Sequence, residues 1–417
     1  MHTLAQLRSG ELIGTKRLTL SENLTSFPEE IFELAETLEI LDLSHNLLTS
    51  LPENINKLSK LKIAFFSYNR FTHIPSFLGC ENLTMLGFKG NAIELFDEDI
   101  LPLNINWLIL TDNKLKGLPK SIGKLHKLQK FPLAGNQIER LPEEMASCQN
   151  IELLRLSANQ LQEIPSWLLT LPKLSWLAFS GNPCSGKQKF GLQEVPYTSL
   201  EVKELLGTGA SGEIFKAYSK LHEEDVALKL FKGAITSDGY AHDEMNLCMS
   251  IGEHPNLIKV LAKIKGDEKL GLLLEYIPAI YQNLGLPPDF KTCTRDTFKQ
   301  ETVLSLETIR AVAQSIASAA VHLHSRGIMH GDLYAHNILI NDVDHCYLGD
   351  FGAASFYQPH QHEFEKIEVR AFGCLLEDML SLCPIKEREE YRSLERLRIQ
   401  CMSENSKERP FFSEIRF

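Results

Sequence analysis

Two aspartates and an asparagine in the second half of the chain have the types and spacing that suit phosphate chemistry. Asp332 stands five residues before Asn337, and Asp350, which precedes Phe351 and Gly352, comes 18 residues after Asp332. Phosphoryl transfer depends on charges and metal ions that are placed around the transferring group. A carboxylate such as Asp332 can orient a hydroxyl nucleophile or accept its proton, and Asn337 and Asp350 can hold Mg²⁺ against phosphates.

A glycine-rich loop and a lysine upstream of these residues could bind the phosphates. The loop covers 207–212, with glycines at Gly207, Gly209 and Gly212, and glycine lets backbone amides approach a phosphate closely. The same spacing also marks dinucleotide-binding folds, in which a helix directly follows the glycines. Here an apolar, strand-like run returns instead, and it carries Lys229, 17 residues after Gly212. This order fits a β-hairpin lid over ATP.

A buried lysine in such a strand needs an anionic partner. Glu244 comes 15 residues after Lys229, in the stretch 241–251, which has helical character. We expect Glu244 to pair with Lys229, and Asp243 is the alternative one position away.

In this order and spacing, the motifs resemble the protein kinase family over about residues 199–417. The run 405–411 is similar to the family's final-helix signature, and the run 368–373 resembles its Asp-x-Trp-Ser-x-Gly helix. The resemblance implies an α+β bilobal domain that uses ATP and Mg²⁺ as cofactors.

The resemblance also implies a role for individual residues. Lys229 would contact the α- and β-phosphates, backbone groups of Glu275 and Ile277 would bind adenine, and Ala227 and Leu339 would enclose its ring. The implied catalytic residues are Asp332, Lys229 and Glu244. The implied cofactor-binding residues are Gly207, Gly209, Gly212, Ala227, Lys229, Glu275, Ile277 and Leu339. The implied magnesium ligands are Asn337 and Asp350.

The catalytic loop departs from the family pattern. Gly331 stands where the family has an arginine that pairs with a phosphate on the activation segment, so the sequence predicts a non-RD kinase that needs no such phosphate. Tyr334 stands where Ser/Thr kinases have a lysine, and His336 where tyrosine kinases often have an arginine. Unless His336 is protonated, the charge developing on the transferred phosphoryl is poorly compensated, and we expect slow chemistry.

The activation segment is short and lacks the Ala-Pro-Glu motif. Its only hydroxyls before the next helix are Ser355 and Tyr357. Arg409 therefore lacks the glutamate that usually pairs with it, and we expect Glu363 or Glu365 to take that place.

Three functions are consistent with these residues. The first is an ATP-dependent protein kinase, for Ser/Thr rather than Tyr. The second is a small-molecule phosphotransferase, because the run 330–333 (His-Gly-Asp-Leu) resembles the aminoglycoside and choline kinase families, which also lack Ala-Pro-Glu. The third is a pseudokinase scaffold that binds nucleotide without turnover, although Lys229, Asp332, Asn337 and Asp350 are all retained. The strand that carries Lys229 favours the first.

The first half of the chain is a repeat array. Asparagine recurs every 22–23 residues, at Asn23, Asn46, Asn69, Asn91, Asn113, Asn136, Asn159 and Asn182. The pattern resembles the leucine-rich repeat family over residues 1–185, and predicts an α/β solenoid whose short strands stack while the asparagines bond backbone groups in a ladder. Residues 186–198 are expected to link it to a second domain at 199–417, so the fold class is multidomain.

The residues on either side of each buried strand centre would line one face of the solenoid. The large apolar ones are Ile40, Ile63, Phe65, Met85, Trp107, Ile109 and Trp176. Exposed apolar patches usually mark partner sites, so we expect a protein substrate or regulator to bind them on the concave face. Coverage by the second domain is the alternative.

The composition excludes several classes of protein. The 417 residues are 43% apolar and 23% charged, with a net charge of −11, which argues against nucleic-acid binding. Apolar runs are too short for a membrane span, and residues 1–6 do not begin a secretory signal. Nine scattered cysteines argue against a disulfide scaffold or structural zinc. We expect a cytoplasmic protein.

Overall fold

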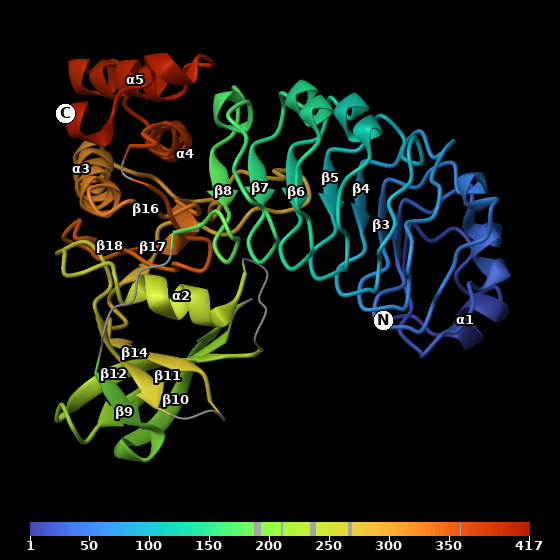
Figure 1. Ribbon diagram of the computed structural model, residues 1–417, viewed down its shortest axis with the longest axis horizontal. Coiled ribbons are helices and arrows are strands. Elements are labelled where there is room, and N and C mark those ends of the chain that lie inside the picture. The colour runs from blue at the N-terminus through green and yellow to red at the C-terminus, as the bar shows by residue number, and fades with distance from the viewer. Residues whose placement is uncertain (187–192, 210–211, 234–238, 266–268, 359) are drawn as a thin grey trace. The chain divides into compact units, whose positions relative to one another are not determined.

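The computed structural model describes residues 1–186, 193–209, 212–233, 239–265, 269–358 and 360–417 (Figure 1). These residues form two compact units. The first comprises 1–154 and 159–171, and the second comprises 155–158 and 172–417. The second unit therefore includes the last repeat strand and a four-residue segment from the repeat before it.

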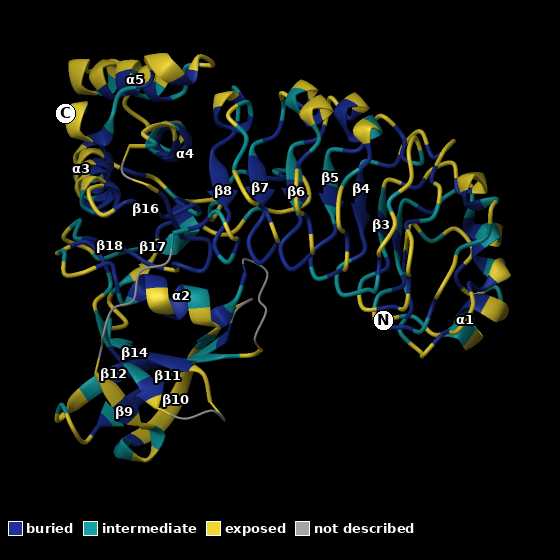
Figure 2. Ribbon diagram, in the orientation of Figure 1, coloured by how far each residue is buried: buried dark blue, intermediate teal, exposed yellow. Residues whose placement is uncertain are grey.

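Within the described residues, the repeats contribute an eight-stranded sheet in the chain order β1 to β8, and its paired strands are parallel. The strands are β1 (Arg17–Thr19), β2 (Ile40–Asp42), β3 (Ile63–Phe65), β4 (Met85–Gly87), β5 (Trp107–Ile109), β6 (Lys130–Pro132), β7 (Leu153–Arg155) and β8 (Trp176–Ala178). The central residue of every strand is fully buried. Strands β7 and β8 are buried along their whole length and are dark blue in Figure 2. One repeat cannot bury this side chain alone, so the repeats must stack.

From Asn46 onward the repeat asparagines form the predicted ladder, whereas Asn23 is exposed. Asn46 Nδ2 donates to the carbonyl oxygens of Leu20 and Leu43 at 2.8 and 2.9 Å, and its Oδ1 accepts from the backbone N–H of Leu24 at 2.9 Å. These bonds satisfy backbone groups where the chain leaves the strand, which would otherwise be buried without partners.

The connections between the repeat strands contain 3-10 helices, and a short α-helix precedes them. These elements are α1 (Leu4–Arg8), η1 (Glu29–Leu34), η2 (Ile55–Lys57), η3 (Lys120–Lys124), η4 (Glu143–Ser147) and η5 (Leu168–Thr170). Thr3 caps α1, because its hydroxyl accepts from the backbone N–H of Gln6 at 3.2 Å.

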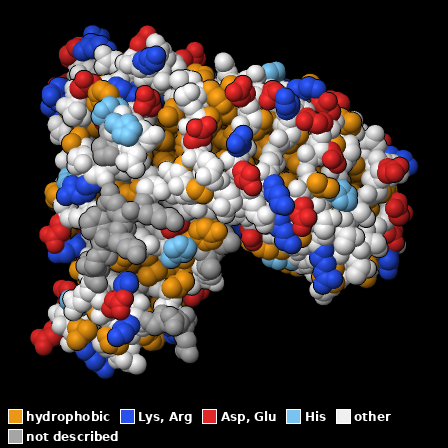
Figure 3. Space-filling view, viewed as in Figure 1, with side chains coloured by type: hydrophobic (Ala, Val, Ile, Leu, Met, Phe, Trp, Pro, Cys, Tyr) orange, Lys and Arg blue, Asp and Glu red, His pale blue; other side chains and the backbone are white. Residues whose placement is uncertain are grey.

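On the face of the molecule drawn in Figure 3, acidic and basic side chains are interspersed.

The predicted apolar stripe is only partly accessible. Ile40, Ile63, Phe65, Trp107 and Ile109 are half-buried, although they were expected to be exposed. Met85 and Trp176 are buried, with exposed fractions of 2% and 1%. Their placement in an exposed stripe was wrong, because strand alternation says which side a residue faces and not what covers it.

The second unit begins its sheet inside the predicted linker. Within the described residues this sheet has six strands in the order β10-β11-β12-β14-β13-β9. The strands are β9 (Glu194–Pro196), β10 (Leu200–Thr208), β11 (Gly212–Ser219), β12 (Glu224–Phe231), β13 (Val260–Lys265) and β14 (Gly271–Glu275). β9 pairs parallel to β13, although its residues were expected to be linker. Residues 187–192 of the predicted linker lie outside the described residues.

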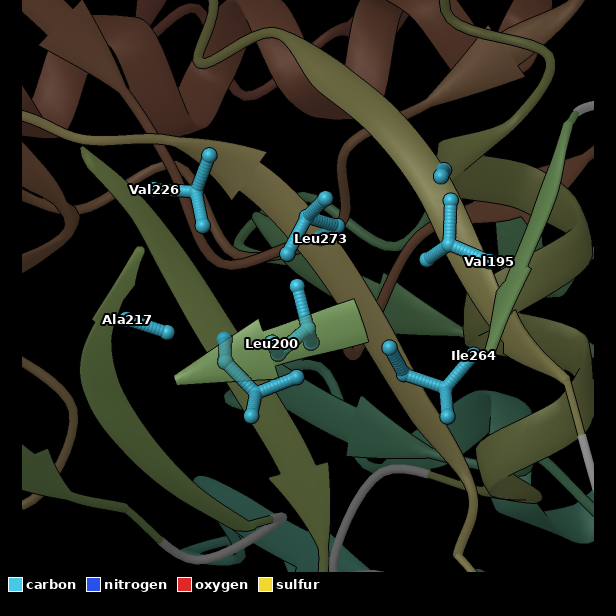
Figure 4. Packing of buried hydrophobic residues seen from close by; sticks show 8 residues of the cluster. Val195, Leu200, Ala217, Val226, Ile264 and Leu273 are labelled. Carbon is cyan, nitrogen blue, oxygen red and sulfur yellow. The ribbon is translucent and has the colours of Figure 1, made fainter. Parts of the chain in front are cut away.

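A cluster of aliphatic side chains fills one side of this sheet (Figure 4). Its buried members are Val195, Leu200, Ala217, Val226, Leu228, Ala262, Ile264 and Leu273. Helix α2 (Ala241–Cys248) follows β12 in the chain. The sheet thus holds β12, and with it Lys229, in a fixed position beside the helix that carries Glu244.

The remainder of the second unit is mainly helical. Its elements are β15 (Gln282–Asn283), α3 (Leu306–His324), β16 (Ile328–Met329), η7 (Ala335–Asn337), β17 (Ile338–Ile340), β18 (Cys346–Leu348), β19 (Ser355–Phe356), α4 (Glu363–Ser381), α5 (Glu389–Cys401), η8 (Ser406–Glu408) and η9 (Phe412–Glu414), with η6 (Tyr197–Ser199) before β10. The short strands form two small sheets, β15-β17-β18 and β16-β19.

The cysteines form no disulfide in the part of the chain that the structure describes. All nine lie within these described residues. Every helix in the described ranges is too short or too polar to pass through a lipid bilayer.

Candidate active site

Lys229 is buried between two carboxylates. Its Nζ forms an ion pair with Glu244 Oε1 and lies 3.7 Å from Asp350 Oδ1. Burial alone would lower the pKa of Lys229, but the charges of Glu244 and Asp350 outweigh it and raise this pKa above its ordinary value. The lysine is therefore charged, and its partner is Glu244, as predicted, rather than Asp243.

Asp350 is the second residue of the loop between β18 and β19. Its backbone has φ +53°, and its side chain is 54% exposed. Burial acts to raise the pKa of this carboxyl, but the nearby Lys229 ammonium lowers it below its ordinary value, an effect that solvent weakens at such exposure. The next residue, Phe351, is buried, and its ring centre lies 4.9 Å from that of His330. Asp350 is thus an ionised group that faces solvent beside a fixed lysine.

Asp332 and Asn337 meet because η7 turns the chain back between them. Asn337 Nδ2 donates to both the carbonyl oxygen and the carboxylate Oδ2 of Asp332, each at 2.9 Å. Since the amide nitrogen is used in this way, the amide oxygen of Asn337 is the atom that could ligate a cation. Together with the Asp350 carboxylate it offers the hard oxygen donors that Mg²⁺ prefers.

A cavity of about 130 Å³ lies beside Lys229. Its lining is Gly209, Gly212, Ile214, Lys229, Glu244, Cys248, Ile258, Val260, Leu272, Leu274, Gly349, Asp350 and Phe351. Four other predicted cofactor-binding residues, Ala227, Glu275, Ile277 and Leu339, are outside this lining, as is Gly207. The cavity therefore contains three of the residues predicted to bind phosphates, Gly209, Gly212 and Lys229, and the ATP site as a whole stays a prediction.

The glycine turn approaches the next strand closely. Gly209 N–H donates to the carbonyl oxygen of Gly212 at 2.9 Å. A Cβ on Gly212 would lie 2.3 Å from the carbonyl oxygen of Leu230, so only glycine fits there. Ala210 and Ser211, at the tip of the predicted loop, lie outside the described residues.

Comparison with known proteins identifies both halves of the chain. Residues 200–372 match the family model of the protein kinase domain, and residues 36–93 and 103–161 match a leucine-rich repeat model. This chain joins leucine-rich repeats to a protein kinase domain.

The curated relatives that match this chain are distant. A probable cyclin-dependent serine/threonine-protein kinase of Dictyostelium discoideum is 27% identical over 159 residues, which are 38% of this chain and 23% of that protein. The serine/threonine-protein kinase SSN3 of Phaeosphaeria nodorum is 25% identical over 250 residues, or 51% and 53% of the two chains. The chain thus spans between about a quarter and about half of the length of these relatives.

A buried glutamate in the kinase domain holds the catalytic loop. Glu368 on α4 accepts from the backbone N–H groups of His330 at 3.1 Å and Gly331 at 2.7 Å, and lies 2.8 Å from His324 Nε2. Burial acts to raise the pKa of Glu368, but the bond to His324 and the charges of His324 and His330 lower it. Glu368 is the first residue of the run 368–373, which resembles a kinase helix signature. This signature is the signal in the sequence that could have revealed its role.

His336 also has a partner that was not predicted. Its Nδ1 lies 2.6 Å from Asp296 Oδ1, and its backbone N–H donates to Asp296 Oδ2 at 3.0 Å. Burial acts to lower the pKa of His336, but the hydrogen bond and charge of Asp296 raise it above its ordinary value. Protonation of His336, which the sequence left open, is therefore favoured. The carboxylate of Asp296 balances the resulting positive charge.

Arg409 is held by backbone carbonyl groups. It donates to the carbonyl oxygens of Ser403 at 2.8 Å, Lys366 at 3.0 Å and Pro172 at 2.8 Å. The expectation that Glu363 or Glu365 pairs with it was wrong, because these three acceptors already surround the guanidinium. Burial lowers its pKa to about 10.

Both hydroxyl groups of the activation segment, those of Ser355 and Tyr357, are buried and hydrogen-bonded. Ser355 Oγ accepts from the backbone N–H of Phe179 at 2.9 Å, and Tyr357 Oη lies 2.8 Å from His324 Nδ1. Their exposed fractions are 0% and 8%. A kinase that phosphorylated either one would first have to open this part of the fold.

We therefore expect the domain to work without phosphate on this segment. Phosphatase treatment should leave the rate of phosphate transfer within about twofold, and mass spectrometry should find Ser355 and Tyr357 unmodified. The double variant Ser355→Ala, Tyr357→Phe should keep activity within about tenfold, a change of roughly 1.4 kcal/mol. A phosphorylated Ser355 or Tyr357, together with a larger loss on phosphatase treatment, would contradict this expectation.

Proposed function

We propose that this chain is an ATP-dependent protein kinase that transfers the γ-phosphate of ATP to a protein hydroxyl, of Ser/Thr rather than Tyr. The observation that carries the proposal is Lys229 held between Glu244 and Asp350. In protein kinases, the lysine–glutamate pair and the metal-binding aspartate must both be in place for transfer. The names of the two serine/threonine-kinase relatives support the same acceptor class.

In the proposed mechanism, Mg²⁺ would supply positive charge that compensates the ATP phosphates. Asp350 and Asn337 would hold it through oxygen atoms, and Lys229 would orient the α- and β-phosphates. Asp332 would orient the acceptor hydroxyl and take its proton. Gly209 and Gly212 would cover the phosphates with backbone amides. Gly207, Ala227, Glu275, Ile277 and Leu339 would complete the ATP site.

The test offers γ-labelled ATP and Mg²⁺ to the full chain with three acceptors. These are a generic basic protein, a Ser/Thr peptide with its Tyr counterpart, and a mixture of small aminoglycosides and choline. Label on the protein or Ser/Thr peptide supports the proposal, and label on the small alcohols alone would instead show a small-molecule phosphotransferase. Nucleotide binding by calorimetry with no transfer would show a pseudokinase. Omission of Mg²⁺ is the control.

We also propose that the repeats bind a protein substrate or regulator through the half-buried strand residues. These are Ile40, Ile63, Phe65, Trp107 and Ile109. The Phe65 ring lies over Gly87, where a Cβ would be 2.8 Å from its Cδ1, and Lys130 Nζ lies 4.0 Å from the Trp107 ring centre. Aromatic rings beside a cation are common at protein interfaces.

The matching prediction concerns the double variant Phe65→Ala, Trp107→Ala. We expect it to weaken binding of a protein substrate by about tenfold or more, since buried aromatic contacts of this kind each contribute on the order of 1 kcal/mol or more. Transfer to a short peptide should stay unchanged, because the variant leaves the kinase domain intact. Leu78→Ala, at another exposed repeat position, is the control. If the wild type and the double variant bind the protein substrate with equal affinity, these strand residues do not form its binding site.

A further inference from the structure

Two residues of the catalytic loop that depart from the kinase pattern lie against the last repeat strand. The Tyr334 ring stacks on Trp176 of β8, with ring centres 4.3 Å apart and planes 7° from parallel. Tyr334 is buried, and burial raises its pKa well above the ordinary value. It therefore carries no charge, and the position that holds a lysine in Ser/Thr kinases is occupied by a packing contact instead.

Only glycine fits at position 331, because strand β8 leaves no space there for a side chain. The backbone of Gly331 has φ +74°, and a Cβ there would lie 2.6 Å from the carbonyl oxygens of both Leu177 and Ala353. An arginine at this position, as in the kinase pattern, would clash with the backbone of β8 and adopt an unfavourable conformation. Gly331 and Tyr334 thus both pack directly against residues of β8.

An arginine from the repeats reaches the residue between them. Arg155, the last residue of β7, belongs to the second compact unit. Its Nη2 forms an ion pair with Asp332 Oδ1, and its Nη1 donates to the carbonyl oxygen of Gly331 at 3.0 Å. The side chains of Arg155 and Asp332 are only 6% and 19% exposed. Because both side chains are largely buried, solvent and salt weaken the attraction between Arg155 and Asp332 only a little.

The backbone around Asp332 is held from the same side. Trp176 Nε1 donates to the carbonyl oxygen of Leu333 at 3.1 Å, so Arg155 and Trp176 bond the residues directly before and after Asp332. The carboxylate is fixed at both oxygens, because Asn337 donates to Oδ2. Each carboxylate oxygen has two lone pairs, so acceptor capacity remains for a substrate hydroxyl.

We propose that Arg155 is a positioning residue of the kinase reaction, supplying beside Asp332 the positive charge that the catalytic loop itself lacks. Arg155 orients the Asp332 carboxylate for the acceptor hydroxyl and places a cation where negative charge develops during transfer. Arg155 and strand β8, which both belong to the second compact unit, then help to position the catalytic loop. This inference rests on the proposed kinase function.

The experiment compares the full-length wild type with Arg155→Ala and Arg155→Lys. We expect Arg155→Ala to lower kcat by about 100-fold, in the range seen when one group that stabilises a transition state is removed, with the KM for ATP within about threefold. Arg155→Lys should recover part of the rate. Millimolar guanidinium should also accelerate Arg155→Ala, since it can enter the vacated space, and should leave the wild type unchanged. Arg140→Ala, at an exposed repeat arginine, is the control.

The outcomes separate this inference from the proposed function. A wild type that transfers no phosphate overturns the proposed function and the inference with it. An active wild type with an equally active Arg155→Ala overturns the inference alone, and a faster Arg155→Ala overturns it by showing that Arg155 blocks Asp332. A slow Arg155→Ala that neither guanidinium nor lysine improves, with a lowered melting temperature, assigns Arg155 a purely structural role and also overturns the inference.

Discussion

Replacing Asp350 with alanine is expected to reduce phosphate transfer about 1000-fold or more, a change of roughly 4 kcal/mol in the activation free energy. Asp350 is the half-exposed carboxylate beside Lys229, and with Asn337 it offers the oxygen ligands proposed for Mg²⁺. Without it the metal would lose an anionic ligand, and Lys229 would lose one of its two carboxylates while keeping Glu244. The measurement is the initial rate of transfer from γ-labelled ATP over a range of Mg²⁺ concentrations.

The stability of the Asp350→Ala variant should change little, because the side chain is largely solvated. This separates a chemical effect from unfolding. The matched control is Asp342→Ala, which changes an exposed aspartate in the turn between β17 and β18 and should stay within about twofold of the wild type. Transfer that persists at the wild-type rate in Asp350→Ala would show that Asp350 is not a metal ligand.

Replacing Glu368 with alanine is expected to destabilise the second unit by about 3–5 kcal/mol, the usual cost of breaking a buried charge pair. The variant leaves His324 without its carboxylate and leaves the N–H groups of His330 and Gly331 without their acceptor. Two measurements follow from this. Urea denaturation should report the loss of stability, and hydrogen exchange of the His330 and Gly331 amides should accelerate.

The same carboxylate gives a dependence of stability on pH. The folded-state pKa of Glu368 is lowered from 4.5, so its contribution is present above the unfolded pKa and is lost as the pH falls through the folded value. We therefore expect the wild type to lose stability over this acid range and Glu368→Ala to lose less. Glu363→Ala, at an exposed position of the same helix, is the control and should cost under about 0.5 kcal/mol. Unchanged exchange at His330 and Gly331 would contradict the role assigned to Glu368.

Sequence reasoning succeeded where residues of one motif are brought together by local structure or by a pattern with fixed spacing. The five-residue spacing of Asp332 and Asn337 becomes a direct contact through a single 3-10 turn. The pairing of Lys229 with Glu244 follows from a strand and a helix whose order was visible in the chain. The repeat asparagines form their ladder because the repeat period itself fixes their positions.

It failed where a partner comes from a distant segment without a signature of its own. Asp296 belongs to no recognised motif, and the repeat pattern does not specify the residue type at position 155. Only the folded chain therefore reveals that Asp296 and Arg155 reach His336 and Asp332. Arg409 was expected to need a carboxylate, whereas backbone carbonyl oxygens, which every sequence offers, surround it. Trp176 was read as a partner site because its position in the repeat does not reveal that Tyr334 covers it.

The positions in the chain at which the two compact units meet affect how such a protein can change in evolution. Residues 155–158 and 172–185 belong to the same compact unit as the kinase domain, although they are part of the repeat array. Repeats before position 154 could be duplicated or deleted one unit at a time without disturbing Asp332. An insertion of one repeat between Arg155 and Trp176 would separate two side chains that bond adjacent points of the catalytic loop. Recombination that exchanges whole repeats should therefore be tolerated early in the array and selected against at its end.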